Sequence, residues 1–189
     1  PPRSTLFPYT TLFRSGAGNA VKQGSSVHLV LSCPSQGYSG GSGAATDPYQ
    51  IGSAEAWVHL STSSSDWNSN THFALTSDIN FHGATIVPIT VYLEEPYAIN
   101  SFRGTLDGNG FVVSHAVIDL PGQDGVGLFG SLGGYVRHLG VRDILVTGRN
   151  RTGGLAGSVG GGSILNCFSG CTVEGSVDTG NLVGSNSAQ

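Results

Sequence analysis

The sequence predicts an all-β fold, a right-handed parallel β-helix (β-solenoid) with coils of about 27 residues, preceded by one short helix. Three observations carry this prediction: an unusual composition, a repeat of fixed length, and short strand patterns separated by turn signals. Glycine makes up 30 of the 189 residues and charged residues only 11%, against about 7% glycine and about 25% charged residues in a typical soluble domain. This composition favours glycine turns and uncharged strands over helices with charged faces.

Charge and hydropathy exclude two classes of partner. Lys and Arg number 8 against 12 Asp and Glu, a net charge of -4, so the chain has no basic surplus with which to bind a nucleic acid. It contains no run of about 18 apolar residues, so we expect no membrane span in this fragment. We find no cofactor motif and predict no cofactor.

The first residues are predicted to be an artefact. Residues 5–15 read TLFPYTTLFRS, which resembles the in-frame translation of a common short-read sequencing adapter. This resemblance implies a metagenomic source. We divide the chain into an adapter-derived artefact (1–15), an uncertain N-terminal segment (16–37) and a repeat domain (38–189). We expect this domain to be truncated at its C-terminus, with further repeats of the same chain beyond it.

A single helix is predicted near the start of the domain, over residues 53–60. Ser53 is a suitable N-cap, and Glu55 lies in the first turn, where a carboxylate is favourable. Three apolar residues of this segment recur at helical spacing: Ala56, Trp57 and Leu60.

Short strands are expected after this helix. Residues 72–81 alternate apolar and polar side chains, with one break in the middle. Residues 84–93 form another β pattern, in which Pro88 favours an edge or a corner because it has no amide N–H to donate. Residues 102–118 contain two β patterns around the turn sequence DGNG.

A repeat of fixed length decides the fold. The segments VGLFGS, GGLAGS and GNLVGS begin at residues 126, 153 and 180, so the three are evenly spaced. They align three columns of identical residues: Leu128, Leu155 and Leu182; Gly130, Gly157 and Gly184; and Ser131, Ser158 and Ser185. Stacked repeats bury a continuous core, so we expect the leucine column to point inward. We expect the glycine column to form tight corners with positive φ.

A second match has a different interval. Val136 aligns with Ile164, and Val146 aligns with Val173. The first of these intervals is longer by one residue than the second, which equals the interval of the glycine-rich segments. We interpret the difference as a shift of one residue within the intervening loop.

Charged residues share the spacing of the glycine-rich segments: Asp124, Arg151 and Asp178. In a parallel solenoid they would stack as one column of alternating sign, and such cross-strand pairs stabilise by about 0.2–1 kcal/mol each. We therefore predict that the leucine, glycine and charge columns form a structural ladder.

Residues 153–175 (GGLAGSVGGGSILNCFSGCTVEG) resemble the GLUG-motif repeats of bacterial surface proteins, including Ile164, Asn166 and Cys167. The lead-in segments YSGGSG, DPYQI and FRGTLDGNG are also similar to those of such proteins. The resemblance implies an adhesin-like or large extracellular protein. It supplies no catalytic residues.

Two local motifs have alternative interpretations. Cys167 and Cys171 lack a nearby His or second Cys pair for a metal site. For Cys167 we favour a buried apolar side chain, with a disulfide or a metal ligand as alternatives. The DGNG sequence at 107–110 lacks the further ligands of an EF-hand loop, so we favour a structural turn over a calcium loop.

The rival function is a carbohydrate-active β-helix, such as a polysaccharide lyase or hydrolase, or an accessory domain of a secreted peptidase. Hydrolysis needs two carboxylates about 5–10 Å apart in one groove. The available charged residues are Asp119, Asp124, Asp143, Arg137, Arg142, Arg149 and Arg151. Only the column of alternating sign aligns across coils, so we predict no catalysis in this fragment.

We therefore predict a non-catalytic extracellular repeat module of a bacterial surface or secreted protein, acting as an adhesive or stalk region. Its expected partners are glycans or surface proteins. Three aromatic residues are candidates for stacking on sugars: Tyr92, Tyr97 and Tyr135.

Overall fold

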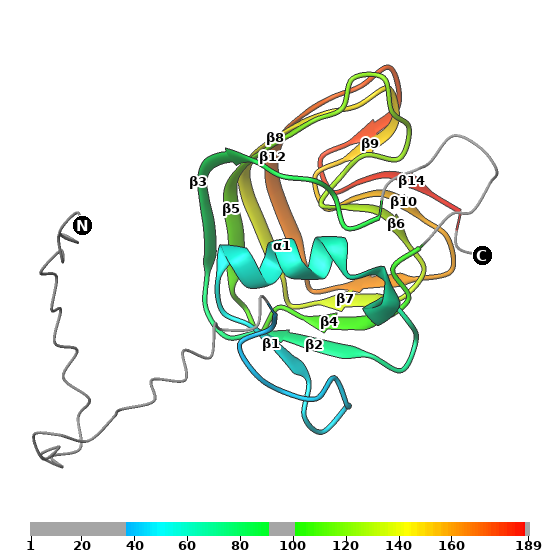
Figure 1. Ribbon diagram of the computed structural model, residues 1–189. Helices are drawn as coiled ribbons and strands as arrows, with labels where there is room; N and C mark the ends of the chain where they lie inside the picture. Colours follow the sequence, from blue (N-terminus) through cyan, green and yellow to red (C-terminus); the bar gives the residue numbers. More distant parts are fainter. Residues whose placement is uncertain (1–36, 91–100, 188–189) are drawn as a thin grey trace, which may run out of the picture. The chain divides into compact units, whose positions relative to one another are not determined.

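The computed structural model describes residues 37–90 and 101–187, and it confirms a parallel β-solenoid with one α-helix (Figure 1). Within these residues, fourteen strands stack into four sheets. The adapter-like residues 5–15 and the segment 16–36 lie outside the described residues.

Each sheet gathers strands from successive coils. The five-stranded sheet consists of β1 (Tyr49–Ile51), β2 (His72–Leu75), β4 (Thr105–Asp107), β7 (Tyr135–Arg137) and β11 (Ser163–Leu165). The four-stranded sheet consists of β3 (Ile79–Thr85), β5 (Val112–Asp119), β8 (Gly140–Thr147) and β12 (Phe168–Glu174). The three-stranded sheet consists of β6 (Phe129–Leu132), β10 (Ala156–Val159) and β14 (Val183–Asn186), and the two-stranded sheet of β9 (Asn150–Gly153) and β13 (Val177–Gly180). We number the coils 1 to 5 by their strand in the five-stranded sheet, so coil 5 runs from β11 to β14.

The pairing register is the one that the repeat alignment predicts. Ala156 pairs with Phe129 in coil 3 and with Val183 in coil 5, which are the partners that the glycine-rich segments align. Ile164 pairs with Val136, as the second match predicts. Equivalent residues therefore stack on one another through coils 3, 4 and 5.

The shift of one residue lies inside a strand and not in a loop, which corrects the sequence interpretation. β12 pairs with β8 through a bulge between Gly170 and Thr172. The earlier coils also depart from the period, because His72 pairs with Thr105 across a longer interval than any pair of the later coils. That interval includes the segment after β3.

Two of the three strand predictions are confirmed. Residues 72–81 fall on β2 and the start of β3, and the DGNG sequence turns the chain between β4 and β5, with positive φ at Asn109 and Gly110. The β pattern over residues 84–93 is wrong beyond Thr85, where β3 ends. Ile89 forms only an isolated bridge, and Pro88 beside it has no N–H with which to extend a ladder; residues 91–93 lie outside the described residues.

The core is a continuous row of apolar side chains inside the solenoid. The rings of Phe73, Phe102 and Phe129 follow one another with centroid distances of 5.7 and 5.1 Å. Leu128 and Leu155 are completely buried. This packing joins the coils across the interior as the strand pairs join them along the rim.

The predicted helix is confirmed as α1 (Ala54–Thr62), followed by a short 3₁₀ helix, η1 (Ser64–Asp66). Ser53 is its N-cap and accepts a hydrogen bond of 3.2 Å from the N–H of Ala56. The same serine hydrogen-bonds Glu55 and lowers the pKa of that carboxyl. In Figure 1, α1 (cyan) lies across the front end of the stacked coils. Its buried side chains include Trp57, whose ring meets Phe129 edge-on at 6.3 Å, so α1 closes this end of the core.

One buried hydroxyl yields a stability prediction. Thr152 Oγ1 is buried and has no hydrogen-bond partner among the described residues, whereas Val126 fills the same column in coil 3. An unpaired buried hydroxyl costs about 1–3 kcal/mol. We therefore expect Thr152→Val to raise the free energy of unfolding, measured by urea denaturation. Thr179 occupies this column in coil 5 and is exposed, so Thr179→Val should change it less; an equal gain in both variants would contradict this account.

Candidate functional site: the polar columns and the exposed last coil

The glycine column is required by close backbone approach and not by positive φ, which corrects our expectation. Gly130, Gly157 and Gly184 are absent from the positive-φ residues of the described chain. A Cβ on Gly157 would instead lie 2.5 Å from the backbone nitrogen of Val126, and one on Gly184 would lie 2.5 Å from the backbone carbon of Arg151. In the next column, Ser158 pairs with Ser131 and Ser185.

The charge column lies at the turn into the two-stranded sheet. Asp124 Oδ2 lies 3.8 Å from a guanidinium nitrogen of Arg151, and the flanking pairs of β9 and β13 place Asp178 opposite Arg151. The strongest partner of Asp124 was not predicted: Arg149 Nε donates to Asp124 Oδ1 at 2.7 Å. The signal was available, since Arg149 lies two residues before Arg151.

A second ion pair joins coils 3 and 4. Arg137 Nε donates to Asp107 Oδ2 at 2.8 Å, and His138 Nδ1 lies 3.1 Å from Asp107 Oδ1. The same carboxylate accepts the N–H of Asn109 at 2.9 Å. Asp107 is therefore held within its turn and to the next coil at once, which supports the structural interpretation of the DGNG sequence.

The remaining charged candidates are distributed along the four-stranded sheet. Asp143 Oδ2 lies 3.2 Å from Arg142 Nε and 3.8 Å from His115 Nε2, with all three side chains about half exposed. Asp119 ends β5. Within residues 37–90 and 101–187, no three His, Cys, Asp or Glu side chains gather in a way that could hold a metal ion.

Both cross-coil carboxylates have lowered pKa values. The hydrogen bond from Arg149 lowers the pKa of Asp124, against a smaller opposing effect of burial. Burial opposes ionisation of Asp107, but the hydrogen bonds from Asn109, His138 and Arg137 outweigh it, so this pKa is also below its ordinary value. Each pair therefore stabilises the fold only while the carboxylate is ionised.

This gives a pH prediction. A carboxyl with a lowered folded pKa adds stability that is fully present above its unfolded pKa, near about 4. That stability is lost as the pH falls through the folded pKa. We expect the melting temperature to fall as the pH drops below about 4. The fall should be shallower in Asp124→Asn, which has no carboxyl to protonate; an unchanged slope in that variant would contradict the role of Asp124.

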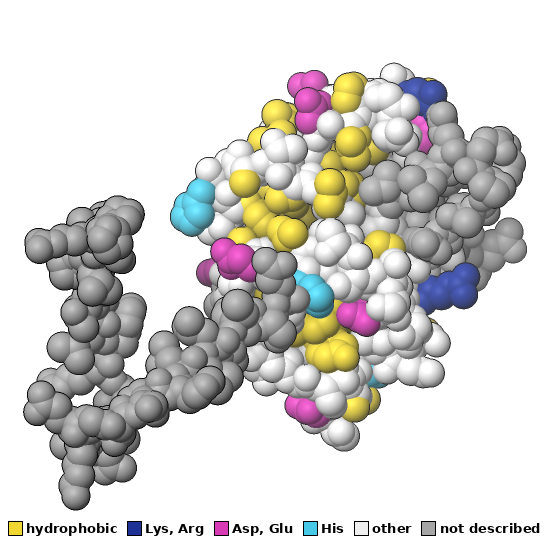
Figure 2. Space-filling model, viewed as in Figure 1, with side chains coloured by type: hydrophobic (Ala, Val, Ile, Leu, Met, Phe, Trp, Pro, Cys, Tyr) yellow, Lys and Arg dark blue, Asp and Glu magenta, His cyan; other side chains and the backbone are white. Residues whose placement is uncertain are grey.

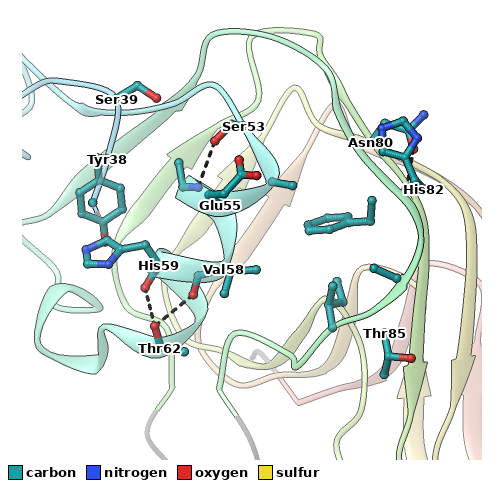
Figure 3. A pocket seen from close by; sticks show the side chains of 16 residues that line it. Tyr38, Ser39, Ser53, Glu55, Val58, His59, Thr62, Asn80, His82 and Thr85 are labelled. Carbon is teal, nitrogen blue, oxygen red and sulfur yellow. Dashed lines mark hydrogen bonds between the residues drawn. The ribbon is translucent and has the colours of Figure 1, made fainter. Parts of the chain in front are cut away.

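A groove of about 860 Å³ lies between α1 and β3. Figure 2 shows hydrophobic side chains gathered on this face of the molecule, and Figure 3 shows Glu55 and His59 on the helix facing the strand that carries Asn80 and His82. Sequence analysis missed this groove because it arises where coil 1 places α1, and not a strand, beside the edge strand β3.

Tyr38 is fixed at one end of this groove. Its ring stacks on Tyr49 at 4.3 Å and meets His59 edge-on at 4.8 Å. Its hydroxyl donates to Asp66 at 2.9 Å, and burial together with this carboxylate raises the pKa of Tyr38 well above its ordinary value. The tyrosine is therefore a packing element that joins the lead-in of the domain to η1.

Coil 5 exposes apolar side chains that earlier coils cover. Leu165, Phe168 and Val177 are 56%, 54% and 58% exposed. Leu182, the last member of the leucine column, is only partly buried, although Leu155 beneath it is completely buried. The core of the solenoid is therefore exposed at coil 5.

Cys167 and Cys171 lie in this exposed coil. Both are free thiols and partly buried, and burial raises the pKa of each. Cys167 packs against the core, and its Sγ lies 3.4 Å from the carbonyl oxygen of Leu165. The structure thus contains no disulfide between these two cysteines.

These features define a class, the parallel β-solenoid repeat proteins. No protein-family model matches the chain, and no solved structure matches it. Within the described residues, no helix has the length and apolar character that a membrane span requires.

Two relatives place this solenoid within longer proteins. The chain is 33% identical over 158 residues to "Halomucin" of Haloquadratum walsbyi, an alignment that covers 78% of this chain and 2% of that protein. It is 30% identical over 130 residues to a "Gly-rich membrane protein" of Evansella cellulosilytica, covering 64% of this chain and 14% of that protein. The chain therefore spans a small part of either relative.

Proposed function

We propose that the chain is a non-catalytic repeat module of a bacterial surface or secreted protein, of the GLUG type, in which the solenoid acts as a stalk or adhesive region. The observation that carries this proposal is the parallel stacking of coils in register, with Asp107 and Asp124 paired to arginines of the next coil. The similarity to small parts of a halomucin and of a Gly-rich membrane protein supports it.

The geometry of the carboxylates favours this function over that of a polysaccharide lyase or hydrolase. Three of the acidic candidates lie against arginines: Asp107 with Arg137, Asp124 with Arg149, and Asp143 with Arg142. A catalytic pair needs two carboxylates that face one substrate groove. Pairing each acid with a base in this way instead favours a structural role.

The adhesive role rests on fewer groups. Tyr92 and Tyr97 lie outside the described residues. Tyr135 on β7 is 59% exposed and offers its ring to a sugar face. We therefore assign any glycan contact within the described coils to the surface around Tyr135.

The enzymatic alternative is tested with the full chain and two variants, Asp107→Asn and Asp124→Asn. We expect no cleavage products from a panel of neutral, acidic and amino polysaccharides. We also expect both variants to melt at a lower temperature than the parent chain, because each loses an ion pair between coils. Cleavage by the parent chain that disappears in either variant would show that the carboxylates are catalytic and would overturn the proposal.

The adhesive alternative is tested separately on a glycan array. If the module binds glycans through its described coils, Tyr135→Ala should lose binding, whereas Tyr135→Phe should retain it because the ring is kept. Absence of binding by the parent chain would leave the stalk role and exclude the glycan-adhesive one for the glycans on the array.

A further inference from the structure

We propose that coil 5 is a docking surface for one further coil of the same repeat, a segment of about 27 residues that continues the parallel sheets. This inference rests on the proposed function as a repeat module. It commits to the direction of growth, to the register, and to the sign of one charge in the coil that docks.

The first argument is the change in burial between coils 4 and 5. The inward positions of coil 4 are essentially completely buried: Val136, Leu139, Ile144, Val146, Leu155 and Ala156. The residues that stack on them in coil 5 are only partly buried against the core: Ile164, Cys167, Cys171, Val173, Leu182 and Val183. Each inward column therefore continues into coil 5 but lacks the cover that coil 5 gives to coil 4.

The second argument is the strand edge. β11, β12, β13 and β14 are terminal strands of the four sheets, so all four sheets present an edge on the same side. Free edges of this kind pair with a further strand. The established interface between coils 4 and 5 uses these same four ladders, and a further coil would repeat it.

The opposite end explains why the occupant is a coil and not a second copy. α1 closes the first end of the core with buried side chains, Trp57 among them, so copies cannot stack head to tail. Two copies that met through coil 5 would form an isologous contact. One would be inverted, and its strands could not continue the parallel columns.

The third argument is charge. Asp124 and Arg151 form an ion pair in the charge column, and the exposed Asp178 is the next member of that column. Arg151 and Asp178 have the same backbone φ of 53°, so the column keeps its geometry into coil 5. A docking coil should therefore place a basic residue over Asp178.

The test extends the full chain after Gln189 with a copy of residues 134–160. The copy of Tyr135 then stands at position 191 and lies as far beyond Ser163 as Ser163 lies beyond Tyr135, its partner in coil 4. With the bulge that already joins β8 to β12, the copy of Arg151 enters the column of Asp178. A matched control has the same extension with the copy of Arg151 replaced by Asp.

We expect the arginine extension to raise the melting temperature and to slow labelling of Cys167 and Cys171 by a maleimide at least about tenfold, because the new coil covers both thiols. The aspartate extension should melt lower than the arginine extension. A second extension, a copy of residues 162–187 with the copied Asp178 changed to Arg, should behave like the first, and it guards against a failure peculiar to one copied sequence.

Two outcomes would overturn the proposal. One is that both arginine-bearing extensions leave the melting temperature and the labelling rates unchanged or worse. The other is that the unextended chain sediments as a dimer with its thiols already protected, which would make a second copy the occupant. Neither outcome depends on the polysaccharide assay, so failure of this inference is distinguishable from failure of the proposed function.

Discussion

Gly157→Ala should destabilise the solenoid by about 1–3 kcal/mol or more, although the change adds a single methyl group. A Cβ at this position would lie 2.5 Å from the nitrogen of Val126 and 2.8 Å from the carbonyl oxygen of Arg151. Both atoms belong to backbone that is hydrogen-bonded between coils, since Val126 N–H donates to Arg151 O at 3.1 Å. The clash therefore cannot be relieved by a side-chain rotation and must open the stack locally. Thermal unfolding followed by circular dichroism would measure the loss.

The matched control is Gly122→Ala. A Cβ there meets no atom within 4 Å, and Gly122 does not have positive φ. Its substitution should therefore change stability by less than about 0.5 kcal/mol. If both variants melt together, close backbone approach is not what requires the glycine column.

The register of the solenoid could be predicted because identical residues stack on themselves. One repeat alignment placed Phe129, Ala156 and Val183 in one column, and the strands pair there. The reason for the glycines could not be predicted, because a short side chain permits both positive φ and close approach. The structure uses the second, and it gives positive φ to Arg151 and Asp178 instead.

The candidate site was predicted less completely than the fold. The repeat spacing identified Asp124 and Arg151 as neighbours, but Arg149, outside that spacing, makes the shorter contact with Asp124. Spacing fixes which backbone positions stack, whereas the reach of a long arginine side chain decides which charge it meets. The groove beside β3 was missed for a related reason, since periodicity describes repeated coils and α1 is the element that does not repeat.

Trp57→Ala should cost about 3–5 kcal/mol, as large truncations in a core do. Trp57 is 1% exposed and packs edge-on against Phe129, which belongs to coil 3. Its ring therefore links the helix to a coil well beyond the one that follows it in sequence. Trp57 Nε1 has no hydrogen-bond partner among the described residues, so Trp57→Phe, which keeps an aromatic ring and loses only that N–H, should cost much less than the alanine variant.

Val58→Ala is the control, because Val58 is the next residue of the same helix and is 44% exposed. Alanine has a higher helix propensity than either residue, so a loss of stability in Trp57→Ala but not in Val58→Ala would arise from the core contact and not from the helix itself. Chemical denaturation with a common slope for the three variants would make the comparison quantitative. Equal stability of Trp57→Ala and Val58→Ala would mean that α1 lies on the end of the solenoid without closing it. In that case the first coil would be as exposed as coil 5, and the argument that only one end accepts a further coil would fail with it.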